Sequence, residues 1–147
     1  MENQHCGFVL VIDSKYWNRL CGSQKDAQNV KYFVRRGAAA PRATEKLLFY
    51  VAKRMQILGE ADFTERIVGD REDLWTRFGA ESFFESADEY REYAGGSRKM
   101  TFLHFKNFKE IIEPKSKNEV VRLLGSLVWL RPRYVSKETT ELLEKGC

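Results

Sequence analysis

Residues 45–63 read EKLLFYVAKRMQILGEADF, and they decide the fold. Residues 47–51 form a continuous apolar run, which is typical of a strand buried on both faces. From residue 56 to residue 68 apolar and polar side chains alternate, which is the period of a half-exposed strand. Gly59 replaces a side chain inside this second strand, so we expect a bulge or a close backbone approach there.

The flanking segments mix strands with short helices. Residues 8–12 predict another buried strand, and residues 99–108 an aromatic-rich one. Asp13 and Ser14 can cap a helix from residue 15 to residue 20 that stops at Gly22. Further helices are expected at 72–78, at 87–94, at 118–124 and after Ser136. Since there is no regular βαβ alternation, the sequence predicts an α+β fold.

One segment is predicted to lack regular structure. Residues 35–42, RRGAAAPR, combine small residues with a proline, so they predict a loop that carries Arg35, Arg36 and Arg42. A short strand at residues 30–34 precedes this loop.

Length and composition indicate one globular domain, residues 1–147, with 43% hydrophobic and 31% charged residues. No apolar run approaches the roughly 18 residues that cross a bilayer, and the first residues lack signal-peptide features, so a cytoplasmic protein without a membrane partner is expected. The three cysteines show no two-residue spacing, which favours reduced thiols over a metal site built from His5, Cys6 and Cys21. No metal or other cofactor is expected.

Charge is distributed unevenly along the chain. Residues 1–58 contain ten basic and four acidic side chains, residues 59–95 four and eleven, and residues 96–147 eleven and six. If the two basic thirds share one face, that face attracts phosphate groups while the acidic middle points elsewhere. The alternative is that the basic side chains only keep the surface soluble.

Standard catalytic motifs are absent. The chain contains no GxGxxG, P-loop, GxSxG or HExxH pattern. His104 lies in an apolar context that favours a sheet or core position. The carboxylates of residues 72–73 and 88–89 fall at helix starts, where the helix dipole and capping explain them.

Basic and aromatic residues instead occur close together in three places. Tyr16 and Trp17 begin the first helix, and Tyr32 lies among basic residues. Trp129 and Tyr134 bracket two arginines near the end of the chain. Aromatic rings offer stacking faces to bases and guanidinium groups pair with phosphate, which is the combination that single-stranded RNA recognition uses. The alternative is that the tryptophans belong to the core.

These residues carry a resemblance to the PUA-like superfamily. Residues 45–51 and 57–63 resemble the central strand pair of its ASCH and EVE branches, in which a Phe-Tyr strand precedes a Gly-acidic-Ala strand. The first strand followed by residues 14–17, Ser-Lys-Tyr-Trp, is similar to the start of EVE-type domains. Residues 133–136, Arg-Tyr-Val-Ser, resemble the ending of archaeal PUA-like proteins of unknown function.

The resemblance implies a small β-barrel of about five to six strands, closed or nearly closed, with short helices packed around it. Such domains usually bind RNA or modified bases, and EVE-type relatives use a pocket beside the first helix, which implies roles for Ser14, Tyr16 and Trp17. Two features depart from the pattern. Residues 43–46, Ala-Thr-Glu-Lys, replace the usual Gly-Asp turn, and the ASCH Gly-x-Lys signature is absent.

The prediction is therefore a non-catalytic domain that binds RNA or a nucleotide in a basic, aromatic-bearing pocket beside the first helix. One alternative is an amidohydrolase-like enzyme acting on a small modified nucleoside, with Lys31, Lys53 or Glu60 in the pocket. Another is a protein-interaction module that uses the acidic helices around Trp75 and Tyr90. The predicted nucleic-acid-binding residues are Ser14, Tyr16, Trp17, Lys31, Tyr32, Arg35, Arg36, Arg42, Lys53, Arg131 and Arg133.

Overall fold

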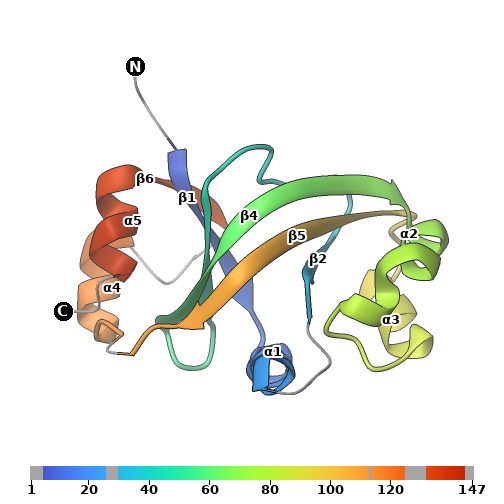
Figure 1. Ribbon diagram of the computed structural model, residues 1–147, viewed down its shortest axis with the longest axis horizontal. Helices are drawn as coiled ribbons and strands as arrows, with labels where there is room; N and C mark the ends of the chain where they lie inside the picture. Colours follow the sequence, from blue (N-terminus) through green and yellow to red (C-terminus); the bar gives the residue numbers. More distant parts are fainter. Residues whose placement is uncertain (1–4, 26–29, 113, 125–131, 145–147) are drawn as a thin grey trace.

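The computed structural model describes residues 5–25, 30–112, 114–124 and 132–144. Its elements form one mixed sheet with helices on several sides (Figure 1). In chain order they are β1 (His5–Ile12), α1 (Ser14–Lys25), β2 (Tyr32–Arg36), β3 (Lys46–Val51), β4 (Gln56–Asp70), α2 (Arg71–Phe78), η1 (Gly79–Glu81), α3 (Ala87–Ala94), β5 (Lys99–Glu110), α4 (Lys117–Leu124), β6 (Arg133–Ser136) and α5 (Lys137–Glu144). The α+β prediction is confirmed.

The six-stranded sheet curls but does not close into the predicted barrel. The strand order is β2-β5-β4-β3-β1-β6, with β1 and β3 parallel and the other neighbours antiparallel. The outer edge of β2 contacts the segment between β4 and β5 and does not pair with β6. The Tyr93 hydroxyl donates to the Val34 carbonyl oxygen (3.2 Å), and Tyr32 forms a bridge with Ser82. The helical segment between β4 and β5 therefore lies against this edge, and β2 and β6 remain the two edge strands of an open sheet.

The strand prediction from residues 45–63 is confirmed. Gly59 lies at a register shift between β3 and β4, as expected for a bulge. A Cβ atom at Gly59 would lie 2.6 Å from Cη2 of Trp17, so the glycine also permits a close approach. Helix α1 thereby packs its tryptophan against the strand and covers one end of the sheet (Figure 1).

Two other local predictions need correction. Helix α1 does not stop at Gly22 but continues to Lys25, because this exposed glycine is tolerated in a helix that buries Trp17 and Leu20. Arg35 and Arg36 lie in strand β2 and not in a loop, because they pair with Thr101 and Met100 of β5. Pairing with the distant strand β5 therefore determines the structure of this segment.

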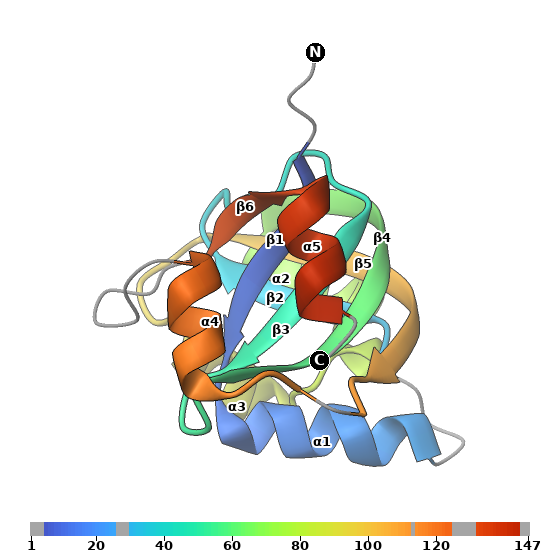
Figure 2. The same cartoon turned by 90° about the vertical axis from the view of Figure 1, so that its left-hand side faces the viewer.

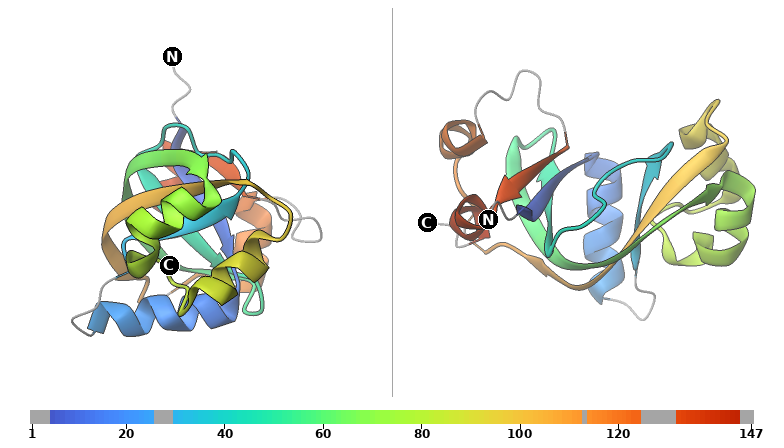
Figure 3. Two further views of the ribbon diagram at one scale, coloured as in Figure 1. Left: turned by 90° about the vertical axis from the view of Figure 1, so that its right-hand side faces the viewer. Right: turned by 90° about the horizontal axis from the view of Figure 1, so that it is seen from above.

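Helices cover the sheet on different sides. Helices α4 and α5 lie over β1, β3 and β6, where a second apolar cluster contains Val9, Leu48 and Tyr50 (Figure 2). Helices α2 and α3 cover the far ends of β4 and β5 (Figure 3). Tyr90 of α3 is fully buried there and stacks on Trp75 of α2 at 4.8 Å. Within the described ranges no helix is long and apolar enough to cross a membrane.

The acidic helices do not point away from the basic first third of the chain. Glu89 of α3 accepts two hydrogen bonds from Nη1 of Arg19 at 2.7 and 2.8 Å, and it lies 3.4 Å from Nζ of Lys15. The side chain of Arg19 also pairs with Glu85 at 3.2 Å. Lys15 and Arg19 of α1 therefore pair with an acidic residue of α3 and help to hold the two helices together.

Candidate functional site

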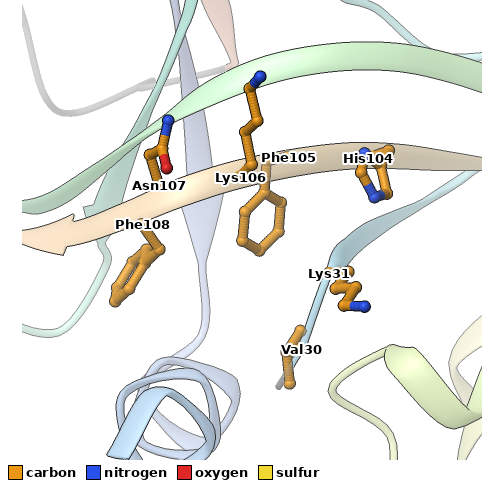
Figure 4. Close-up of a pocket in the computed structure, with 7 residues that line it drawn as sticks. All are labelled: Val30, Lys31, His104, Phe105, Lys106, Asn107 and Phe108. Atoms are coloured by element: carbon orange, nitrogen blue, oxygen red, sulfur yellow. The ribbon is translucent and has the colours of Figure 1, made fainter.

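Strand β5 forms one wall of a pocket that lies between the beginning of β2 and helix α1 (Figure 4). The cavity has a volume of about 270 Å³. We call it the β5 pocket, and it is lined by Val30, Lys31, His104, Phe105, Lys106, Asn107 and Phe108.

An irregularity in β5 gives this pocket its two aromatic rings. Side chains normally alternate between the faces of a strand, which would place Phe105 and Phe108 on opposite faces. Asn107 has a positive φ of 56°, a conformation that asparagine tolerates better than most residues. In Figure 4 both phenylalanine rings point toward the same space, while Lys106 and Asn107 point the other way.

The two rings are anchored differently. Phe105 is only 3% exposed and packs on Phe49 at a centroid distance of 5.7 Å, so it belongs to the core. Phe108 is half-buried and meets Trp17 edge to face at 5.6 Å. Phe108 is therefore the ring that is both fixed in place and partly accessible.

Polar groups surround these rings. The ammonium group of Lys31 lies 3.2 Å from a carboxylate oxygen of Glu81, and both side chains are about half exposed. His104 contacts the Thr64 hydroxyl through Nδ1, and its ring lies 4.9 Å from that of Tyr32. The pocket thus combines an apolar floor with the ammonium group of Lys31 and the imidazole of His104 at its rim.

A charged network on the opposite face of the sheet holds the bulge. The side-chain amide of Asn107 donates to a carboxylate oxygen of Asp62 at 2.8 Å, and the same carboxylate lies 2.8 Å from Nζ of Lys46. Hydrogen bonds from Lys46 and then from Asn107 lower the pKa of Asp62. Asp62 therefore stays ionised. Its hydrogen bond fixes the side chain of Asn107, the residue at which the alternation of side chains along β5 shifts.

Of the residues predicted near α1, only Lys31 lines the β5 pocket. Trp17 and Tyr32 are 5% and 7% exposed, and they pack behind the pocket wall. Tyr16 is half-buried and stacks on Phe83 at 4.6 Å, where burial raises its pKa. Ser14 begins α1 at a half-buried position.

The predicted arginines lie elsewhere. Arg35 is half-buried beside the ring of Phe8, with its guanidinium carbon 5.7 Å from the ring centroid. The guanidinium of Arg36 lies over Tyr93 at 5.4 Å. The exposed Arg42 donates its backbone N–H to the Tyr134 hydroxyl at 2.7 Å. Arg35 and Arg36 end β2, and Arg42 follows in the β2–β3 connection. The ring of Tyr93, which Arg36 covers, lies 6.3 Å from that of Tyr16 in α1.

The remaining predicted residues are Lys53, Arg131 and Arg133. Lys53 is exposed in the turn between β3 and β4. Arg131 lies outside the described residues, as do the side chains of Arg133, His5 and Cys6.

Two of the three groups considered for catalysis are paired, Lys31 with Glu81 and Glu60 with Lys46. Glu60 is 9% exposed and accepts a hydrogen bond from Nζ of Lys46 at 3.3 Å. The hydrogen bond with Asp62 raises the pKa of Lys46, which keeps this lysine protonated and unsuited to act as a base or nucleophile.

Comparison with known families gives one match, to a model described as a domain of unknown function, DUF365, over residues 6–129. The chain belongs to the DUF365 family. Comparison with curated proteins finds no match.

Solved structures show which fold this DUF365 chain shares. The structure of ASCH from Zymomonas mobilis has a TM-score of 0.75 at 20% identity, covering 94% of this chain and 93% of that one. A serine-to-alanine variant of the same protein gives 0.79 at 19%, covering 97% and 96%. A tyrosine-to-phenylalanine variant gives 0.76 at 19%, covering 93% and 95%. The predicted ASCH and PUA-like resemblance is therefore confirmed as a likeness of fold, while the archaeal likeness stays a prediction.

The pocket residues that the sequence did not single out as site residues are Val30, Phe105, Lys106, Asn107 and Phe108. The only signal in the DUF365 chain is the spacing of two phenylalanines three residues apart inside a predicted strand. Such spacing conflicts with strand alternation unless a bulge intervenes. An asparagine between the two rings is a residue that permits one.

Proposed function

We propose that this protein binds single-stranded RNA or a nucleotide, without catalysis, by placing a base against Phe108 in the β5 pocket. The observation that carries the proposal is the pair Phe105 and Phe108 on one face of β5 with Lys31 at the rim. An aromatic face contributes roughly 1–3 kcal/mol per stacked base.

The cationic rim supplies the phosphate contact. An exposed ion pair such as Lys31 with Glu81 contributes only about 0–1 kcal/mol. A phosphate group can therefore replace Glu81 as the partner of Lys31 at small cost.

The fold supports the same ligand class. The PUA-like resemblance implies RNA or modified bases as ligands, and the ASCH structures share the architecture that surrounds the pocket. The acidic helices are less suited to the alternative role of a protein-binding surface, because Tyr90 is fully buried and Glu89 is paired with Arg19.

The test is a titration of a short fluorescein-labelled single-stranded RNA, followed by anisotropy at two salt concentrations. Phe108→Leu keeps apolar volume against Trp17 but removes the aromatic face. We expect it to weaken binding by about fivefold to a hundredfold. Lys31→Ala should reduce the salt dependence, because one phosphate contact is lost.

Lys137→Ala serves as the control, because this exposed lysine begins α5 on another side of the molecule. It should bind RNA as the unmodified chain does. Binding that is indifferent to salt, or equal in Phe108→Leu and the unmodified chain, would refute the proposal. A duplex of the same sequence should bind more weakly, since its bases cannot reach the ring.

A further inference from the structure

We propose that Arg35 and Arg66 form a second site, separate from the β5 pocket, that binds a phosphate group. Arg35 comes from β2 and Arg66 from β4, and β5 lies between them. Arg35 is in register with Thr101 of β5, and Arg66 with Leu103. Thr101 and Leu103 are two positions apart, so both arginines start from the same face of the sheet.

The two guanidinium groups converge on one short piece of backbone. Nε of Arg66 donates to the Ala39 carbonyl oxygen at 2.7 Å, and Nη1 of Arg35 donates to the Ala40 carbonyl oxygen at 2.6 Å. The Thr101 hydroxyl donates to the Gly37 carbonyl oxygen at 2.6 Å and accepts from the Ala39 N–H at 2.9 Å. Both guanidinium groups are thus fixed by consecutive carbonyls of a backbone segment that β5 also holds.

Neither guanidinium has a carboxylate partner among the described residues. By contrast, the half-buried Arg19 pairs with Glu89 and the half-buried Lys46 pairs with Asp62. Burial lowers the pKa of Arg35, which shows that its lost hydration is not compensated by a negative charge. An anion at this place would supply that charge.

The geometry favours phosphate over a carboxylate. Each arginine uses a single N–H for the backbone, which leaves the other donors of its planar fork available. The two oxygens of a carboxylate pair with the N–H groups of one guanidinium. A tetrahedral phosphate has enough oxygens to accept from two guanidinium groups that approach from different strands. Phe8 supports the Arg35 guanidinium from the side, so binding costs little side-chain entropy.

The site is independent of the RNA contact proposed above. Thr101 and Phe105 are four residues apart on β5, or about 13 Å along the strand. Leu103 lies between them on the same face of β5, in register with Phe33, and both side chains are buried in the core. The phosphate can belong to a free ion, a mononucleotide or a 5′-phosphorylated RNA, and the experiment separates these sources.

The direct test follows the side-chain Nε–Hε signals of the arginines by NMR while inorganic phosphate is added at constant ionic strength. We expect saturable shifts for Arg35 and Arg66 and none for the exposed Arg98. Repeating the titration with a mononucleotide and with RNA bearing or lacking a 5′-phosphate identifies the source by the tightest binding. Shifts that do not saturate, or that Arg98 shares, would overturn the proposal.

Variants distinguish phosphate binding by these arginines from a role in which they only hold the backbone in place. Arg66→Lys keeps the charge but loses the fork, and we expect phosphate affinity to fall about tenfold or more. The melting temperature without phosphate reports the structural role, whereas the increment that phosphate adds reports binding. Arg98→Lys should keep the full increment, and Phe108→Leu should keep it while losing RNA. An undiminished increment in Arg66→Lys would show that these arginines only hold the backbone.

Discussion

The two proposed sites hold their cations in different surroundings. At the β5 pocket, the half-exposed Lys31 pairs with Glu81, and the accessible ring of Phe108 lies beside Phe105, which belongs to the core. At the second site, Arg35 and Arg66 are half-buried, both donate to backbone carbonyls, and among the described residues neither pairs with a carboxylate. The first site is therefore built by apolar packing, and the second by hydrogen bonds that a ligand can extend.

This difference predicts unequal sensitivity to truncation. Phe105→Ala removes a ring that is 3% exposed and packs on Phe49, so it should lower the free energy of unfolding by about 3–5 kcal/mol. Arg66→Ala removes one hydrogen bond to Ala39 and should cost about 1–2 kcal/mol. Urea unfolding of both variants measures the two values. Equal losses would show that the two sites are not built differently.

The next largest effect should come from the glycine that admits Trp17. A Cβ atom at Gly59 would lie 2.6 Å from Cη2 of Trp17 and 3.1 Å from Cε1 of Phe108, and neither ring can move freely. Gly59→Ala should therefore destabilise the protein by about 1–3 kcal/mol and weaken RNA binding at the pocket. It should leave the phosphate-induced rise in melting temperature unchanged, because the arginines belong to the second site.

Gly22→Ala is the matched control for that substitution. No heavy atom lies within 4 Å of a Cβ built at Gly22, and the residue is inside α1. Alanine there should stabilise the protein by about 0.5–1 kcal/mol. Thermal unfolding that gives both glycine variants the same sign would contradict the packing argument.

The same comparison shows what the sequence can predict. Residues 47–51 and 56–68 identify β3 and β4 because burial imposes a periodicity that survives in the sequence. The bulge at Gly59 can also be predicted, because a glycine inside a strand often marks a bulge or a close approach of another segment. Local pattern and local structure agree at these positions.

The candidate sites are less readable because they depend on contacts between distant segments. Trp17 has the appearance of a ligand-stacking residue, yet the space left by Gly59 takes it into the core. Phe108 faces the pocket only because Asn107 adopts a positive φ. Nothing in the sequence distinguishes Arg66 from the other polar residues of an alternating strand. Its proposed role depends on its hydrogen bond to the carbonyl of Ala39, which lies 27 residues earlier in the chain.

The smallest predicted effect concerns the network behind the pocket. Hydrogen bonds from Lys46 and Asn107 lower the pKa of Asp62 below its ordinary value of 3.8. The resulting stabilisation is fully present above the pKa of the unfolded chain, and it is lost as the pH falls through the lower folded pKa. Asp62→Asn should therefore cost about 1 kcal/mol at neutral pH. Its difference from the unmodified chain should shrink toward about pH 2.

Urea unfolding across this pH range tests the prediction, with Asp88→Asn as the control. Asp88 has a side chain that is 98% exposed and lies 3.6 Å from Arg91, so its replacement should change stability by less than about 0.5 kcal/mol. A difference for Asp62→Asn that stays constant with pH would mean that the carboxylate contributes through shape and not through charge. In that case Asn107 would hold its bulge without Asp62, and RNA binding by the variant should equal that of the unmodified chain.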